Sequence, residues 1–219
     1  MTSRNIAIGD IHGCANALRT LIEAIQPTDQ DTIISLGDLV DRGPDSKGVV
    51  DQLLALRDRT NLVVVMGNHE EMMLAVMDGE SPLEWLKHGG GETMESYGFT
   101  GDISVVPESH LELMRNALLY HETENHFYTH GNYEPKIPLA EQDPMICRWR
   151  SLEQKTPRPH MSGKKAVVGH TPDKSGEIFD IGHLICIDTF CYGGAWLTAV
   201  DVENGTTWQA NDEGELRGV

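Results

Sequence analysis

The chain has 219 residues, of which 39% are hydrophobic and 23% are charged, and its net charge is −17 at pH 7. This length suits one well-cored domain, residues 1–219, and no apolar run approaches the roughly 20 residues that span a bilayer, so we expect no membrane contact. The acidity argues against a nucleic-acid partner, because phosphate backbones are bound through clusters of Lys and Arg.

The first 80 residues alternate between strand-like and helix-like segments. Short apolar runs rich in β-branched residues indicate buried strands, and they occupy residues 4–8, 32–36 and 61–66. Apolar residues at helical spacing follow each run, over residues 15–25, 49–56 and 70–77. This βαβαβ order predicts an α/β fold with a parallel sheet and right-handed crossovers.

The remainder of the chain has a less regular pattern. Residues 79–119 combine helical patches with Pro82 and a Gly89-Gly90-Gly91 run, and they predict a helical, cap-like insertion between strands. Residues 131–164 are rich in Pro and charge and predict a long loop. The remaining strand-like runs are 127–129, 166–168, 184–188, 196–202 and 206–210.

Each of the first three predicted strands ends in a glycine-flanked group of polar residues. The groups are Gly9-Asp10-Ile11-His12-Gly13, Gly37-Asp38-Leu39-Val40-Asp41-Arg42-Gly43 and Gly67-Asn68-His69-Glu70. Open α/β sheets bind ligands at the carboxyl ends of their strands, so we expect these groups to lie together. One Gly-Asp pair alone is more often an ordinary turn, but three successive strand ends with metal-binding side chains indicate a metal site.

Asp10 and His12 are two residues apart. In an extended segment both side chains point to the same side, so a carboxylate and an imidazole can share one ion. Asp38 ends the neighbouring strand and could bridge that ion to a second one. Two such ions lie about 3.5–4 Å apart in known sites and lower the pKa of a bound water towards about 7.

Three further side chains could complete the ligand set. Asn68 offers a neutral oxygen at the end of the third strand, and His130 and His170 each end a later strand-like run. Ligands of the Asp, His and Asn types suit Mn²⁺, Fe or Zn²⁺ better than a metal that prefers thiolates. The sequence therefore predicts a centre for two divalent ions.

The segments GDIHG, GDLVDRG and GNHE resemble the three signature motifs of the phosphoprotein phosphatase (serine/threonine) family within the calcineurin-like metallophosphoesterases. The later segments His130-Gly131, Gly169-His170-Thr171 and Ile187-Asp188-Thr189 follow the order of that family, and the short chain is similar to its compact bacterial and phage members. The resemblance covers most of the chain. It implies a calcineurin-like fold, in which a central β-sandwich with a βαβαβ core is flanked by helices.

The resemblance also implies which residues hold two divalent ions. Those for the first ion are Asp10, His12 and Asp38. Those for the second ion are Asp38, Asn68, His130 and His170, with Asp38 shared between the two. Mn²⁺ is the first choice of metal, with Fe or Zn²⁺ as alternatives.

The same resemblance assigns the chemistry. His69 would be the general acid that protonates the leaving-group oxygen, and Asp41 would orient it. Arg42 would bind phosphate oxygens together with a second arginine, either Arg150 or Arg148, of which we favour Arg150. The reaction would be direct, in-line attack of metal-bound hydroxide on phosphorus, without a phosphoenzyme.

Three functions compete. We expect a serine/threonine protein phosphatase that acts on phosphoproteins or phosphopeptides. The alternative is a symmetrical dinucleoside polyphosphate (diadenosine tetraphosphate) hydrolase, from a sister group that typically has no acid at the position of Asp41. A non-catalytic scaffold of the same fold is the third, and it would lack metal ligands, whereas none is missing from this sequence.

The cysteines and the N-terminal sequence bear on the compartment. The chain has four cysteines without CxxC spacing, too few for a disulfide framework at this length, and they predict reduced thiols. The first residues run directly into a strand-like segment without a secretory apolar stretch. We therefore expect a cytoplasmic protein; the sequence does not indicate its oligomeric state.

Overall fold

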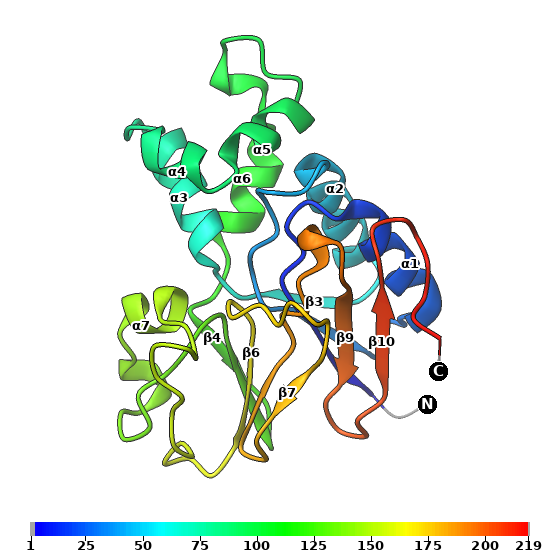
Figure 1. The fold of residues 1–219 in the computed structure, drawn as a ribbon, viewed down its shortest axis with the longest axis vertical. Coiled ribbons are helices and arrows are strands. Elements are labelled where there is room, and N and C mark those ends of the chain that lie inside the picture. Colours follow the sequence, from blue (N-terminus) through cyan, green and yellow to red (C-terminus); the bar gives the residue numbers. More distant parts are fainter. Residues whose placement is uncertain (1–2, 219) are drawn as a thin grey trace.

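The structure, a computed structural model, describes residues 3–218 as two five-stranded sheets with helices around them (Figure 1). The order of the first sheet is β10-β9-β1-β2-β3. Its strands are β1 (Asn5–Ile8), β2 (Thr32–Ser35), β3 (Asn61–Val64), β9 (Leu197–Asp201) and β10 (Thr207–Ala210). β1, β2 and β3 are parallel, with Ile34 paired to Ala7 on one side and to Val63 on the other, which confirms the predicted core.

The second sheet is also mostly parallel. Its order is β4-β5-β6-β8-β7, and the three central strands run in the same direction while the two edge strands are antiparallel. The strands are β4 (Tyr120–Glu122), β5 (His126–Thr129), β6 (Lys165–Val168), β7 (Phe179–Asp180) and β8 (Leu184–Cys186).

Buried side chains from both sheets meet in one apolar layer. The first sheet contributes Ala7 and Ile34, and the second contributes Tyr128 and Val167 to the same cluster. Neighbouring residues of a strand point to opposite faces, so Ile33 packs on the other side of the first sheet, under the helices. The arrangement is the β-sandwich flanked by helices that the family resemblance implies.

Three helices follow the parallel strands of the first sheet. They are α1 (Ala15–Ile25), α2 (Ser46–Arg57) and α3 (Asn68–Met77). Of these, α1 and α2 pack against the sheet. Their apolar stripes are fully buried at Leu18, Leu21 and Leu53, and burial of one such side chain contributes about 1.5–3 kcal/mol to stability. Because each helix starts soon after the carboxyl end of a parallel strand, the turns between them lie at one edge of the sheet.

Residues 79–119, which we name the cap, are helical as predicted. They contain α4 (Leu83–Lys87), α5 (Gly90–Ser96), a 3₁₀ turn (Ile103–Val105) and α6 (Glu108–Arg115). With α3 they project beyond the sheets at the top of Figure 1. That 1–219 is one domain with the cap as an insertion stays a prediction.

The structure differs from the sequence prediction in its shortest elements. The predicted loop 131–164 contains a 3₁₀ turn (Leu139–Glu141) and α7 (Pro144–Trp149). Asp143 caps α7 by accepting a hydrogen bond from the Met145 amide, and proline stands at the first helical turn. A helix of this length is too short for periodicity to detect. Among residues 3–218, no helix is long and apolar enough to cross a bilayer.

Candidate active site

The side chains singled out in the sequence meet at the carboxyl ends of parallel strands from both sheets. His12, Asp38 and Asn68 follow β1, β2 and β3. His130 directly follows β5, and His170 lies two residues beyond β6. The sandwich therefore brings two sets of strand ends together, and ligand sites form at this edge in open α/β sheets.

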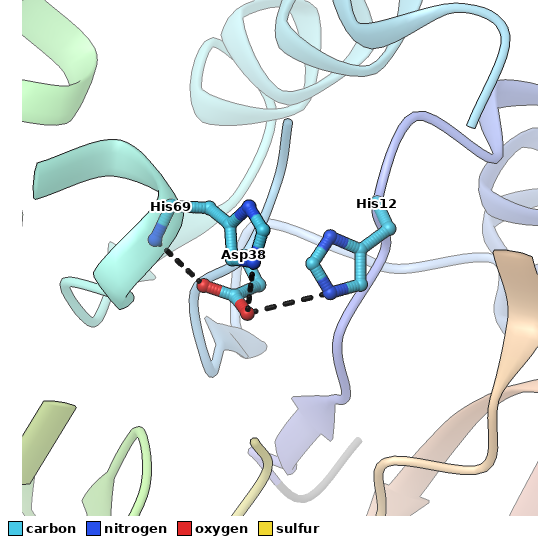
Figure 2. Close-up of side chains that lie close together, drawn as sticks. All are labelled: His12, Asp38 and His69. Carbon is cyan, nitrogen blue, oxygen red and sulfur yellow. Dashed lines mark hydrogen bonds and ion pairs between the residues drawn. The ribbon is translucent and has the colours of Figure 1, made fainter. Parts of the chain in front are cut away.

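Asp38 lies at the centre of the site. Its carboxylate forms one buried group with His12 and His69, and a second group with His130 and His170; within each group the nitrogen and oxygen atoms lie within 4.8 Å of one another. Figure 2 shows the first group, in which Asp38 Oδ2 is 3.3 Å from His12 Nε2 and 3.8 Å from His69 Nε2. One carboxylate shared by two such groups can bridge two ions.

Backbone carbonyls orient three of the imidazoles. In each ring one nitrogen lies within hydrogen-bond distance of a carbonyl oxygen, so the other nitrogen faces the site, as in a metal-ligating histidine. The pairs are His12 Nδ1 with Val40 at 2.9 Å, His130 Nδ1 with Leu36 at 2.8 Å and His170 Nε2 with Trp149 at 3.1 Å. The protonated nitrogen is assigned from these hydrogen bonds.

The turn at His12 differs from the extended segment that the sequence predicts. His12 has φ 45°, and its amide donates to the Asp38 carbonyl at 2.8 Å. Asp10 accepts a hydrogen bond from the His170 amide at 2.9 Å through Oδ2. Asp10 and His12 thus reach the site through a turn and not by alternation along a strand.

Two observations show that a cation fits this arrangement. Within residues 3–218, the carboxylate oxygen Asp10 Oδ1 is buried without a hydrogen-bond partner. Burial and the neighbouring carboxylate of Asp188 raise the pKa of Asp10 well above its ordinary value. Carboxylates crowded in this way are stabilised by a positive ion, and Asp, His and Asn ligands suit Mn²⁺, Fe or Zn²⁺.

Two glycines leave room for these carboxylates. A Cβ atom on Gly67 would lie 2.2 Å from Asp38 Oδ1, and one on Gly169 would lie 2.0 Å from Asp10 Oδ1. Any larger residue at either position would displace a carboxylate from the site. The close approach explains why glycine flanks the third motif and precedes His170.

The loop after β2 has an uncommon backbone conformation. Asp38, Asp41 and Arg42 have φ of 49°, 73° and 71°, in the left-handed region that non-glycine residues seldom adopt. The buried Glu70 carboxylate holds the loop by accepting hydrogen bonds from the Asp38 and Leu39 amides at 2.8 and 2.7 Å. Strain of this kind clusters at functional sites. Sequence reasoning gave Glu70 no role, although it ends the third motif.

His69 differs from the other imidazoles because its partner is a carboxylate. Its Nδ1 lies 2.6 Å from Asp41 Oδ2, and its Nε2 faces Asp38. Although burial lowers the pKa of His69, the nearby Asp38 and Asp41 carboxylates raise it above the ordinary value. These carboxylates therefore favour the protonated imidazole, the form that a general acid needs.

The cap supplies donors that hold Asp41. The Trp85 indole N–H lies 3.0 and 2.9 Å from the two Asp41 carboxylate oxygens, and the Thr93 hydroxyl donates to Oδ1 at 2.7 Å. The Asp41 amide in turn donates to Ser46 Oγ at 3.0 Å. Sequence reasoning missed Trp85 and Thr93, because nothing in the local pattern links residues so far from Asp41.

The pKa values of two more imidazoles shift in opposite directions. The pKa of His130 rises to about 10, because Asp38 outweighs the effect of burial. The pKa of His170 falls to about 4 through burial and the neighbouring His130. Asp38 itself has a lowered pKa despite its burial, because His130 and His69 favour its charged form. The shared carboxylate is therefore ionised, as a bridging ligand must be.

Arg42 is the arginine that reaches the metal-ligand candidates. Its guanidinium Nη1 lies 3.1 Å from His12 Nε2, and its Cζ lies 4.6 Å from the ring centroid of Tyr192. Stacking on an aromatic ring fixes the guanidinium plane while its N–H groups stay available. Sequence reasoning missed Tyr192, since a tyrosine after β8 carries no recognisable motif.

The two other arginines proposed to bind phosphate form ion pairs with glutamates. Arg148 donates to Glu71 of α3, the residue after Glu70, and Trp149 Nε1 donates to the same carboxylate at 2.6 Å. Arg150 forms an ion pair with Glu134. Which of them contributes a second phosphate contact stays a prediction.

Comparison with known proteins adds to this geometry. A family model for calcineurin-like phosphoesterases matches residues 4–185. Serine/threonine-protein phosphatase 1 of Salmonella typhimurium is 43% identical over 84 residues, which are 38% of this chain and 37% of that protein. The symmetrical bis(5'-nucleosyl)-tetraphosphatase of Cellvibrio japonicus is 45% identical over 74 residues, 33% of this chain and 27% of that protein. The matches thus span about a third of these relatives.

A solved structure has the same fold. The crystal structure of a candidate diadenosine tetraphosphatase superposes with a TM-score of 0.70 and 22% identity, covering 96% of this chain and 94% of that one. The family match includes all three motifs and the predicted ligands from Asp10 to His170. The chain belongs to the calcineurin-like phosphoesterase family.

Proposed function

We propose that this protein is a two-metal-dependent phosphomonoesterase and, specifically, a serine/threonine protein phosphatase. The observation that carries the proposal is the buried pair of His69 and Asp41, 2.6 Å apart, beside the shared carboxylate Asp38. A phosphate ester with an alkoxide leaving group needs a proton donor, and this pair provides one next to the candidate metal ligands.

The metal ligands we propose are those of the sequence analysis. The first ion would be held by Asp10, His12 and Asp38. The second ion would be held by Asp38, Asn68, His130 and His170. Mn²⁺ is our first choice, with Fe or Zn²⁺ as alternatives. When bound, such ions acidify a water and withdraw charge from the phosphate oxygens.

The protein's own side chains would carry out the remaining steps. Arg42, with Arg150 or Arg148, would bind the phosphate oxygens and orient the ester. His69 would transfer the proton on Nε2 to the leaving oxygen, while Asp41 keeps the ring oriented through Nδ1. Both side chains are buried.

The choice of phosphoproteins over dinucleotides is supported by Asp41, the residue that the dinucleotide hydrolases typically lack. Relatives named for either activity match at similar identity, so identity alone does not separate the two. A phosphoprotein or phosphopeptide is therefore the proposed partner. The four cysteines are free, which supports a reducing compartment such as the cytoplasm.

A direct comparison of substrates tests this proposal. The purified protein with added Mn²⁺ should release phosphate from phosphoserine and phosphothreonine peptides with a higher kcat/KM than it cleaves diadenosine tetraphosphate. The measurement is the rate of phosphate release set against nucleotide products separated by chromatography. Faster cleavage of the dinucleotide would assign the protein to the alternative activity.

Replacement of Trp85 by Phe should lower kcat for phosphoserine peptides by about tenfold. The change keeps the ring but removes the indole N–H from Asp41, and a hydrogen bond to a charged group contributes about 1.5–3 kcal/mol. Turnover of p-nitrophenyl phosphate, whose leaving group needs no proton, should change much less. Metal content should stay normal.

The matched control for this variant is Trp208→Phe. Trp208 is a half-buried tryptophan on β10, outside the candidate site. A purely structural role of Trp85 would reduce the turnover of both substrates by the same factor and lower the midpoint of thermal unfolding. That outcome would refute the positioning of Asp41 by the cap.

A further inference from the structure

The cap contains a groove that the proposed reaction does not use. It has a volume of about 840 Å³ and lies between the end of α3, α4, α5 and the turn that follows α5. Its apolar wall is formed by Trp85, Leu86, Met94, Phe99 and Ile103. A cavity of this size accommodates several side chains of a bound peptide.

Three side chains of this wall are exposed to solvent. Leu86, Phe99 and Ile103 are 48%, 44% and 39% exposed. Single exposed apolar residues are ordinary, but a cluster of large ones around a groove is typical of an interaction surface. Bringing these three side chains out of water would contribute favourably to binding.

The charges around the groove are of one sign. Its charged lining residues are Glu80, Glu95 and Asp102, and no Lys or Arg lines it within the described part of the chain. A partner segment with Lys or Arg beside its apolar side chain would complement this rim, whereas an acidic segment would be repelled.

The groove wall contacts the proposed acid pair through one side chain. Trp85 lies in the groove wall, and its indole N–H donates to Asp41, which holds His69. One tryptophan thus contributes both to the groove wall and to the hydrogen bonds of the acid pair.

We propose that this groove docks a segment of the phosphoprotein substrate in which a bulky apolar side chain is flanked by Lys or Arg. The proposal depends on the protein phosphatase function proposed above. It separates recognition into two places, the phosphate at the metal centre and the apolar anchor in the cap. Selectivity among phosphoproteins would then come from the anchor.

Direct binding tests the groove without any catalysis. The probe is a fluorescent, unphosphorylated peptide with one Phe or Leu between Lys residues, and the reading is its anisotropy with the whole protein. Ile103→Lys places a positive charge in the groove and should raise the Kd of this peptide by about tenfold or more. Ile137→Lys is the matched control, because Ile137 is equally exposed at 39% but lies outside the groove.

Enzyme kinetics provide a second test of the groove. Ile103→Lys should raise KM for a phosphopeptide that carries the anchor, and it should leave turnover of p-nitrophenyl phosphate unchanged. Equal peptide binding by the two variants, or equal binding of a peptide with Glu in place of Lys, would overturn the proposal. So would a dimer in sedimentation that Ile103→Lys dissociates, because a second copy would then occupy the groove.

The two proposals can fail separately. If the wild-type protein binds the anchor peptide but releases no phosphate from any phosphopeptide, the protein phosphatase function is wrong, and with it the identity of the docked chain as a substrate. If it hydrolyses phosphopeptides with and without the anchor at equal kcat/KM, the function stands and the docking proposal is overturned.

Discussion

Asp38→Asn should remove bound metal and activity together. The substitution keeps the size of the side chain but removes the negative charge that two groups of ligand candidates share. Loss of a residue that only supports a metal ligand costs about 10–100-fold in affinity or activity, so loss of a bridging ligand should cost at least about 100-fold. Metal content after dialysis and kcat with p-nitrophenyl phosphate measure the two effects.

The control for this variant is Asp45→Asn. Asp45 is a nearby exposed carboxylate whose side chain caps α2, and asparagine caps a helix equally well. This variant should retain both metal and activity. Normal turnover by Asp38→Asn at normal metal content would show that Asp38 is not a bridging ligand.

His69→Asn should reduce kcat strongly while leaving the metal content normal. Removal of a general acid typically costs about 10²–10⁴-fold, and the full loss should appear with phosphoserine peptides, whose leaving alkoxide must be protonated. The loss should shrink with p-nitrophenyl phosphate and shrink further with 2,4-dinitrophenyl phosphate. The dependence of log kcat on the leaving-group pKa is the measurement.

His183→Asn serves as the control, because His183 is half-buried and bonded to the Pro157 carbonyl, away from the site. It should leave the leaving-group dependence unchanged. An equal loss for every leaving group in His69→Asn would exclude the acid role. Loss of metal in that variant would instead make His69 a ligand, since its Nε2 is 3.8 Å from Asp38 Oδ2.

The central part of the fold could be predicted from the sequence because its elements carry strong local patterns. The run before Gly9 and the helical spacing from Ala15 to Ile25 match β1 and α1 to within one residue. The edge strands β4 and β7 have only two or three residues and form through pairing with a neighbour. A strand that forms only through pairing with another strand has no hydrophobic pattern of its own from which it could be predicted.

The candidate site was likewise predictable only where a local sequence motif marks its residues. The ligand candidates were predictable because parallel strands end at one edge, so motifs such as those at Asp38 and Asn68 must meet. Trp85 and Thr93 were not, because their contact with Asp41 depends on how the cap packs on the loop after β2. The pairing of Arg148 with Glu71 likewise arises only in three dimensions.

The hydrogen bonds from the cap to Asp41 have a consequence for protein engineering. The ligand candidates follow strands of the sandwich, whereas the groups that hold the acid pair come from residues 79–119. A chimera that receives the cap of another family member would therefore inherit its metal centre from one parent. Its proton donor would work only if the incoming cap brings an indole and a hydroxyl to the same carboxylate.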